Sequence, residues 1–218
     1  AVLDHASNPV LDLVLLLDDP RIGTGPEARE ALRIKLTAPP ETLTGTEAHD
    51  RLTGTSAAET LDGRGGNDQL NGGAGNDILI GGTGTDLLRG GAGADTFVFT
   101  SPRDSAPGAP SYINNGDLNA LAGAGARDII QDFTKGQDVI DLSMMDTDRG
   151  QAGDQAFVWK GNGAFSHRTA DLIYRQFDST GTAHDKTVIY GDLDRDGRAD
   201  FQIELTGLID LSRGDFLL

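Results

Sequence analysis

The amino-acid sequence predicts an all-β protein: a parallel β-roll with two sheets, followed by an antiparallel β-sheet or sandwich that caps it. Two observations in the 218 residues predict this fold class. A nine-residue unit occurs six times without loss of phase between Gly45 and Val98. From Asp128 onward, short alternating or apolar segments are separated by polar turns, which is the spacing typical of antiparallel β-structure.

Each nine-residue unit can form one tight turn and one short strand. Glycine accepts positive φ without steric cost, so the glycine-rich first six residues can make the turn. The last three residues place an apolar side chain between two polar ones, and the middle residue of such a strand points inward. The eighth position holds Leu52, Leu61, Leu70, Leu79, Leu88 and Phe97, and the sixth holds Asp50, Glu59, Asp68, Asp77, Asp86 and Asp95.

The unit resembles the nonapeptide G-G-x-G-x-D-x-U-x of the RTX (haemolysin-type) calcium-binding repeat proteins. This resemblance implies a parallel β-roll that binds about four Ca²⁺ ions or more. Stacked strands lie about 4.8 Å apart and calcium–oxygen distances are about 2.4 Å, so one ion can contact two stacked turns. The predicted calcium ligands are Asp50, Glu59, Gly63, Gly65, Asp68, Gly72, Gly73, Gly75, Asp77, Gly81, Gly82, Gly84, Asp86, Gly90, Gly91, Gly93, Asp95 and Asp104.

Turns that are two units apart stack on the same side of such a roll. The predicted carboxylate pairs are therefore Asp50 with Asp68, Asp68 with Asp86, Glu59 with Asp77, and Asp77 with Asp95. Asp104 lies nine residues after Asp95, so a degenerate seventh turn would place it opposite Asp86. Ala48 and Ala57 replace glycine at the fourth position, so we expect weaker sites in the first two turns. A flexible glycine-rich linker would not keep this phase six times.

The composition excludes several classes of protein. The formal net charge of −16 argues against nucleic-acid binding and against anionic membrane surfaces. Cysteine is absent, so a disulfide framework is excluded and calcium is the candidate staple. No apolar run is long enough to span a bilayer. The sequence starts at Ala1 without a basic-then-apolar leader, and we expect that this start is a cut in a longer chain.

Residues 1–40 form a separate segment, either a cap for the open end of the roll or the tail of an upstream domain. Leu11–Asp19 is interpreted as a buried strand. Thr24 and Pro26 are typical of a helix start, whereas Leu32–Leu36 alternates like a strand. We therefore expect a short helix that runs into a strand. The roll is assigned to residues 41–104, an irregular loop to 105–127 and a C-terminal β domain to 128–218.

The second half of the chain resembles the C-terminal domain of the serralysin metalloproteases. The residues that carry the resemblance are ADTFVF, RDSAPGA, DIIQDFTKGQDVIDLS and GDLDRDGRADFQIELTG. Similar modules occur on other RTX proteins, including the mannuronan epimerases. The insertion at 112–126 departs from the compact serralysin spacing. The terminal residues Asp215, Phe216, Leu217 and Leu218 resemble an uncleaved type I secretion signal; the alternative is an ordinary last strand.

One further acidic motif could bind calcium. Asp192, Asp194, Asp196 and Asp200 resemble the start of an EF-hand loop, but Ile203 stands where the bidentate Glu is required. A hairpin that turns at Asp196-Gly197 is the favoured interpretation, and the two are compatible.

No catalytic site is found in the sequence. The four histidines do not form H-E-x-x-H, and neither a G-x-S-x-G motif nor a P-loop is present. We therefore expect a secreted, extracellular, non-catalytic module that folds on Ca²⁺ and directs its parent protein through a type I (ABC transporter) secretion system. The alternatives are a polyuronate-binding module of a polysaccharide-active enzyme, with a cationic groove at Lys135, Lys160, Arg168, Arg175 and Lys186, or the C-terminal part of a secreted metalloprotease.

Overall fold

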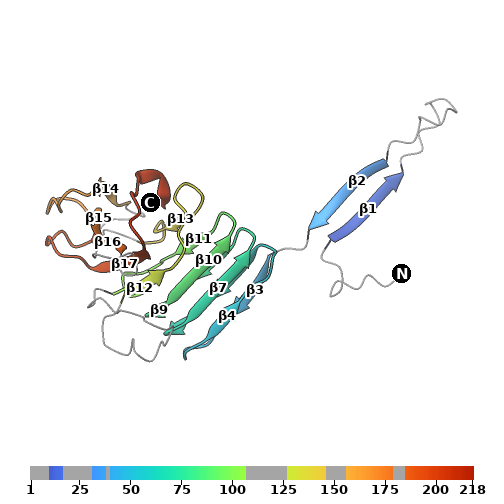
Figure 1. Cartoon of the computed structure of the whole chain (residues 1–218), viewed down its shortest axis with the longest axis horizontal. Coiled ribbons are helices and arrows are strands. Elements are labelled where there is room, and N and C mark those ends of the chain that lie inside the picture. Colours follow the sequence, from blue (N-terminus) through green and yellow to red (C-terminus); the bar gives the residue numbers. More distant parts are fainter. Residues whose placement is uncertain (1–9, 17–30, 38–39, 107–126, 146–155, 179–184) are drawn as a thin grey trace. The chain divides into compact units, whose positions relative to one another are not determined.

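The computed structural model of the chain (Figure 1) describes residues 10–16, 31–37, 40–106, 127–145, 156–178 and 185–218. The chain divides into two compact units, residues 1–40 and 41–218. In the first unit, β1 (Val10–Leu16) and β2 (Ala31–Thr37) pair antiparallel. Both predicted strands are thus present, and residues 17–19 of the first prediction lie outside the described residues. The helix predicted after Thr24 lies outside the described residues.

The second unit contains two large sheets. The eight-stranded sheet has the order β14-β15-β16-β17-β12-β10-β7-β4, and the six-stranded sheet has the order β18-β13-β11-β8-β5-β3. The strands of the repeat region are β3 (Glu41–Thr44), β4 (Arg51–Thr53), β5 (Glu59–Asp62), β6 (Gly65–Gly66), β7 (Gln69–Ala74), β8 (Ile78–Ile80), β9 (Thr83–Gly84), β10 (Leu87–Ala92) and β11 (Thr96–Val98). Successive units alternate between the two sheets, and residues 18 apart are paired in parallel register. This is the predicted β-roll.

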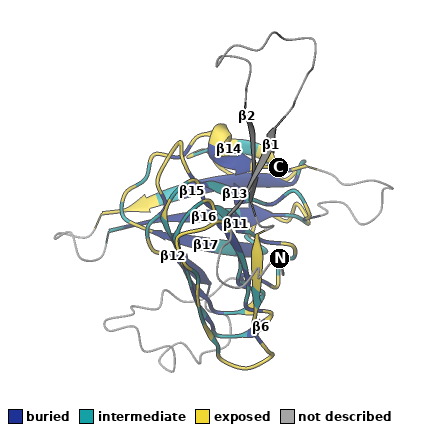
Figure 2. Cartoon of the chain, turned by 90° about the vertical axis from the view of Figure 1, so that its right-hand side faces the viewer, coloured by how far each residue is buried: buried dark blue, intermediate teal, exposed yellow. Residues whose placement is uncertain are grey.

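Two parallel rows of apolar side chains form the core between the sheets. Figure 2 colours the strands by burial, and much of the two large sheets is buried. Within the roll, each eighth-position residue pairs with the eighth-position residue two units away, because the register does not shift. One row runs through Leu52, Leu70, Leu88, Ile130 and Leu205, and the other through Leu43, Leu61, Leu79, Phe97, Ile140 and Phe216. The apolar positions of the repeat therefore form the core of the roll, as predicted.

All six segments predicted as strands after Asp128 are strands. They are β12 (Asp128–Ile130), β13 (Val139–Asp141), β14 (Val158–Gly161), β15 (Asp171–Phe177), β16 (Lys186–Asp192) and β17 (Phe201–Thr206). β15, β16 and β17 form the predicted antiparallel sheet. The prediction of antiparallel pairing was wrong for β12 and β13, which continue the two sheets of the roll in parallel, and for β14, which pairs in parallel with β15.

The last coil of the roll is covered by the C-terminal strands. β17 pairs with β12, and β18 (Phe216–Leu217), which follows the 3-10 turn η3 (Arg213–Asp215), pairs with β13. Phe216 is buried and its ring centroid lies 4.9 Å from that of Trp159. The open strand edges of the last coil are therefore blocked. No helix in the described part of the chain is long and apolar enough to cross a membrane.

Candidate metal centre

The sixth-position carboxylates form two ladders, one along each side of the roll. From the third unit onward, one oxygen of each carboxylate accepts the backbone N–H of the sixth residue two units earlier. The N–Oδ1 distances are 2.8 Å for Asp50 to Asp68, 2.8 Å for Asp68 to Asp86, 2.8 Å for Glu59 to Asp77 and 3.0 Å for Asp77 to Asp95. The structure thus brings together the four pairs that the repeat spacing predicts.

The other oxygen of these carboxylates is buried without a hydrogen-bond partner among the described residues. This holds for Oδ2 of five aspartates: Asp68, Asp77, Asp86, Asp95 and Asp128. Buried polar atoms are normally paired, and a buried ionised carboxylate without a partner is very costly. A row of such oxygens therefore fits a bound cation, which would supply the missing partner.

The first-position glycines bring a second oxygen to the same place. A Cβ atom added at Gly72 would lie 2.4 Å from Asp77 Oδ2 and 2.7 Å from the carbonyl oxygen of Gly90, two units later. At Gly63 the corresponding distances are 2.5 Å to Asp68 Oδ2 and 2.7 Å to the carbonyl oxygen of Gly81. Oxygens from two stacked turns thus converge beside each glycine. Carboxylate and carbonyl oxygens are the ligands that calcium prefers.

The other predicted glycines mainly shape the turns. Gly73, with φ of +103°, and Gly84, with φ of +144°, represent the second and fourth positions, where an L-residue would be strained. Gly75, Gly82, Gly91 and Gly93 have positive φ as well. Gly65 lies at a third position, where an added Cβ would instead meet Glu47 Oε2.

The first two turns differ from the later ones. Thr46 donates both its N–H (2.6 Å) and its hydroxyl (2.8 Å) to Asp50 Oδ2, and these bonds lower the pKa of Asp50. Thr55 likewise donates its N–H to Glu59 Oε2 and its hydroxyl to Oε1. The oxygens that are unpartnered in later turns are therefore satisfied here by protein groups. This difference supports the expectation of weaker sites at these turns.

Both ladders continue past the repeats, through two residues that the sequence prediction missed. Asp86 N–H donates to Asp128 Oδ1 (2.7 Å), and Asp95 N–H donates to Asp138 Oδ1 (3.0 Å). Each begins an acidic-x-apolar triplet, Asp128-Ile129-Ile130 or Asp138-Val139-Ile140, which matches positions six to eight of the repeat. This triplet was the sequence feature from which both ladder residues could have been predicted.

Asp104 lies near the end of the ladder that contains Asp86 and Asp128. Its Oδ2 accepts the N–H groups of Thr100 (2.7 Å) and Ser101 (2.9 Å), and its charge is one of those that raise the pKa values of Asp86 and Asp128. Asp104 was predicted to lie opposite Asp86, but the structure places Asp128 at this position in the ladder, with Asp104 close to both.

Burial is the main cause of the raised pKa values in the ladders. Burial, and then the charge of neighbouring carboxylates, raises the pKa of Asp68 and of Asp95 to about 6. The same two effects raise the pKa of Asp86 to about 8 and that of Asp128 well above its ordinary value. The metal-free roll is therefore strained by its own negative charge at neutral pH.

The second acidic motif lies in the loop that joins β16 to β17. The two strands pair antiparallel, so the predicted hairpin is present, although its loop spans residues 193–200. Asp192, Asp194 and Asp200 can each place a carboxylate oxygen within 4.8 Å of the others; Asp196 is not part of this group. Both oxygens of Asp192 already accept N–H groups, from Arg195 and Gly197. The geometry permits an ion here without requiring one.

The terminal residues are part of the folded structure. Asp215 is buried, and its Oδ2 accepts the N–H (2.7 Å) and the hydroxyl (2.9 Å) of Ser212. Phe216 lies in the core, whereas half of Leu217 is exposed and Leu218 packs at the edge of the core. Phe216 and Leu217 thus form the last strand of the six-stranded sheet, Asp215 precedes it and Leu218 follows it.

Comparisons with known proteins agree with this architecture. Residues 67–218 match the family model of the peptidase M10 serralysin C terminus, and residues 41–70 match that of the RTX calcium-binding nonapeptide repeat. No curated protein sequence matches the chain.

Two similar solved structures are subunits of a mannuronan C5-epimerase from Azotobacter vinelandii. AlgE6R3 has 29% sequence identity and a TM-score of 0.52, covering 82% of this chain and 82% of its own. AlgE6R2 has 28% identity and a TM-score of 0.53, covering 83% of this chain and 92% of its own. The chain therefore belongs to the serralysin C-terminal domain family and carries RTX calcium-binding repeats in its β-roll.

Proposed function

We propose that this chain is a non-catalytic module that folds when calcium fills the carboxylate ladders and that directs its parent protein through type I secretion. The row of buried, unpartnered carboxylate oxygens carries the proposal. Without a cation the ladders place like charges in a desolvated environment, which disfavours the roll. A cation that binds only the folded roll stabilises it by mass action.

The residues proposed to hold calcium are the ladder aspartates and the turn carbonyls beside the first-position glycines. Bound calcium would neutralise the negative charges of these aspartates and would be the missing partner of their second oxygens. The aspartates are Asp68, Asp77, Asp86, Asp95 and Asp128. Extracellular calcium sites typically have dissociation constants of about 10⁻⁴ to 10⁻³ M. In a calcium-poor cytosol the roll would stay unfolded, and it would fold after export.

The position of the terminal residues supports the same order of events. In the folded chain Phe216 is buried against Trp159, and Asp215 is buried as well. A transporter could read Asp215, Phe216, Leu217 and Leu218 only before the last strand forms. Secretion therefore precedes folding in this proposal. Folding on calcium outside the cell would then prevent the chain from returning through the transporter.

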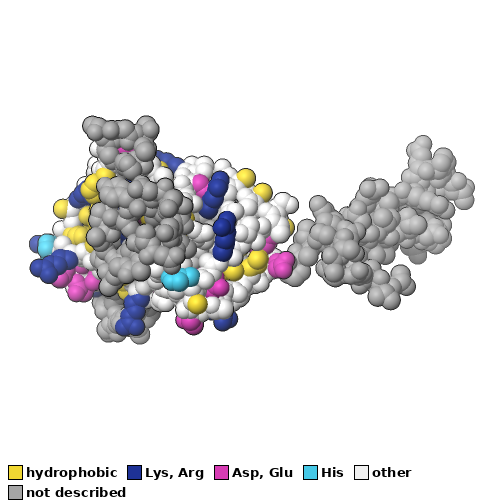
Figure 3. All heavy atoms as spheres, turned by 60° about the horizontal axis from the view of Figure 1, so that its bottom comes forward, with side chains coloured by type: hydrophobic (Ala, Val, Ile, Leu, Met, Phe, Trp, Pro, Cys, Tyr) yellow, Lys and Arg dark blue, Asp and Glu magenta, His cyan; other side chains and the backbone are white. Residues whose placement is uncertain are grey.

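A groove on the roll supports a second candidate function, contact with an acidic polysaccharide. The groove has a volume of about 240 Å³ and crosses the outer face of β4, β7 and β10, where Arg51 and Arg89 stand among the amides of Gln69, Asn71 and Gln131. Basic and acidic side chains are interspersed on the face drawn in Figure 3, so that face is not acidic throughout. Mannuronan, the polymer named for the similar epimerase, carries carboxylates that guanidinium groups bind well.

Four of the five cations that the sequence suggested for this role have partners within the chain; the exception is Arg168, for whose side chain the described contacts include none. Lys135 pairs with Asp210, Lys160 with Asp171, and Lys186 with Glu204. Arg175 donates to the carbonyl oxygens of Asn162 and Gly163. Arg89 of the groove is also paired, with Asp132 Oδ2 at 3.3 Å, but its side chain is mostly exposed. The groove is the basis for the second candidate because it places two arginines together on one face of the roll.

The first prediction concerns folding. Circular dichroism during a calcium titration will show a cooperative increase in β signal, because a bound cation offsets the repulsion between the buried ladder carboxylates. Magnesium at the same concentrations will not substitute, since it demands a tighter octahedral shell and dehydrates reluctantly. A full β signal in excess chelator would contradict the proposal.

The second prediction concerns pH. Because the ladder pKa values are raised, the folded metal-free roll binds more protons than the unfolded chain. Its free energy of unfolding therefore increases as the pH falls from about 8, the pKa of Asp86, towards the ordinary value of 3.8. Protons and calcium compete for the same oxygens, so the calcium affinity decreases over this range. Isothermal titration at several pH values measures it, and Asp86→Asn should flatten the dependence; an affinity independent of pH would count against the ladders as ligands.

The third prediction concerns export. Deletion of residues 215–218 will abolish secretion of the chain by a type I system reconstituted in a bacterial host, as measured by its amount in the medium. The matched control is Leu211→Ala, which also removes a buried side chain but leaves the terminal residues intact. The control should be exported and fold less stably. Export of the deleted chain at the wild-type level would refute the signal.

The fourth prediction tests the groove. Calcium-loaded protein should bind mannuronan in a salt-sensitive manner, and Arg51→Ala with Arg89→Ala should weaken binding by about tenfold or more, since each charge-assisted hydrogen bond contributes about 1.5–3 kcal/mol. Arg198→Ala, which lies outside the groove, is the control. Equal binding by both variants would remove the second candidate.

A further inference from the structure

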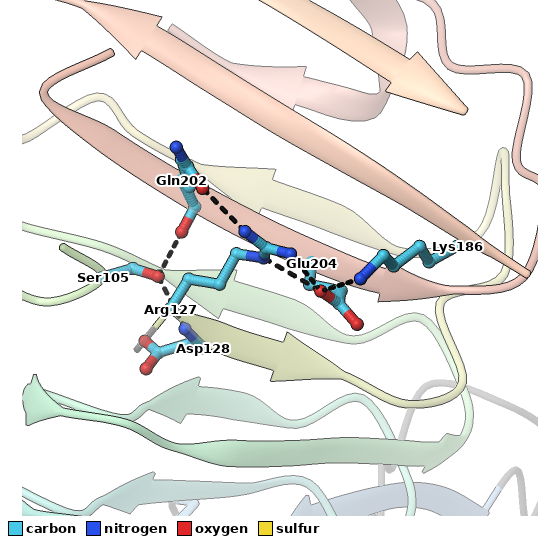
Figure 4. Close-up of polar contacts among 6 residues, drawn as sticks. All are labelled: Ser105, Arg127, Asp128, Lys186, Gln202 and Glu204. Atoms are coloured by element: carbon cyan, nitrogen blue, oxygen red, sulfur yellow. Dashed lines mark hydrogen bonds and ion pairs between the residues drawn. The ribbon is translucent and has the colours of Figure 1, made fainter. Parts of the chain in front are cut away.

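A buried cluster of charged side chains lies beside the last aspartate of one ladder (Figure 4). Arg127, which immediately precedes Asp128, is only 5% exposed. Its Nε and Nη2 donate to Glu204 Oε2 at 2.9 and 2.7 Å, and its Nη1 donates to Gln202 Oε1 at 2.7 Å. Lys186, on β16, donates to the same Glu204 oxygen at 3.3 Å. The guanidinium thus connects the start of β12 to two side chains of β17.

Ser105 makes a second connection at the same place. Its hydroxyl accepts the backbone N–H of Asp128 (2.8 Å) and donates to the carbonyl oxygen of Gln202. Gln202 N–H in turn donates to the carbonyl oxygen of Ser105 (3.0 Å). Figure 4 shows these bonds converging on the start of β12 from the β17 side. Ser105 therefore fixes the amide of Asp128 relative to β17.

Asp128 is held on several sides as a result. The preceding residue, Arg127, is bound to Glu204 through its guanidinium, and the backbone N–H of Asp128 donates to Ser105. The strand that Asp128 begins, β12, pairs with β17 from Asp128↔Ile203 to Ile130↔Leu205. Its side chain points to the ladder, where Oδ1 accepts Asp86 N–H and Oδ2 has no partner among the described residues. The backbone that carries this carboxylate is thus fixed by the C-terminal sheet rather than by the roll alone.

We propose that Arg127 and Glu204 are positioning residues for a calcium site at Asp86 and Asp128, and that they couple this site to the antiparallel sheet of β16 and β17. The inference rests on the proposed calcium binding. A buried ion pair is weak grounds for net stability, because desolvation of the charges offsets their attraction. Groups that orient metal ligands, in contrast, commonly change metal affinity by about 10-fold to 100-fold when they are removed.

The other ladder offers a matched control within the same molecule. Asp138 occupies the corresponding terminal position, and its Oδ2 accepts the N–H of Thr134 at 2.7 Å within its own loop. No ion pair to β17 holds it among the described contacts. A change at Glu204 should therefore act on the site of Asp128 and spare that of Asp138.

The test is a double-mutant cycle on the full chain, with calcium affinity measured by isothermal titration. Glu204→Gln should weaken binding by about tenfold or more. This effect should vanish in an Asp128→Asn background, where the site it positions is already impaired, and persist in an Asp138→Asn background. An equal effect in both backgrounds would show that the cluster only stabilises the fold, and would overturn the proposal.

A second readout does not depend on titration. In saturating calcium, amide hydrogen exchange measured by NMR should show Glu204→Gln reducing protection of the Asp86 N–H, which is bound by Asp128, more than that of the Asp95 N–H, which is bound by Asp138. Equal loss at both amides would contradict positioning. If Glu204→Gln does not fold, Gln202→Ala removes the Nη1 partner and keeps the ion pair. If the wild-type chain binds calcium but the Glu204 variant shows no effect specific to the Asp128 site, this inference alone is refuted. If the wild-type chain binds no calcium, the proposed function is refuted as well.

Discussion

A carboxylate that is buried loses its water, and a neighbouring carboxylate makes its ionisation more costly still. In this roll the constraint recurs every 18 residues on each side, because from the third unit onward each sixth-position carboxylate accepts the backbone N–H two units earlier with one oxygen. The bare glycine beside it leaves room for the other oxygen, which has no partner in the described chain. This geometry is the basis for the proposal that formation of the roll and binding of a cation are one coupled equilibrium.

The two rows of apolar side chains fix the register of the strands in the roll. Leu79 and Leu88 are fully buried, and each pairs with the equivalent residue of the next coil on its side. A slip by one residue would turn these side chains outward and move every carboxylate out of its ladder. The C-terminal strands complete the arrangement, because β17 and β18 cover the last coil and bring Phe216 into the core. The residues of the proposed secretion signal are thereby part of the folded structure.

The repeat region could be predicted from the sequence in detail because its information is contiguous. The inward leucines and the carboxylate pairs follow from a period of nine and from the two-sided geometry of the coil. Asp128 and Asp138 were missed because the segment after Asp104 interrupts the period, and the ladder bond from Asp86 spans 42 residues. The parallel pairing of β12 and β13 was missed for the same reason: alternation indicates a strand but not its direction. Only the acidic-x-apolar triplet marked these two strands as further coils.

The most direct test of the account is diffraction from crystals grown with calcium, with anomalous scattering used to locate the ions. The account predicts ions between stacked turns, in contact with the second oxygens of Asp68, Asp77, Asp86, Asp95 and Asp128 and with the turn carbonyls beside them. Ions found only at the β16–β17 loop, or a closed roll with no ion at these oxygens, would contradict the central claim that bound cations hold the ladders together.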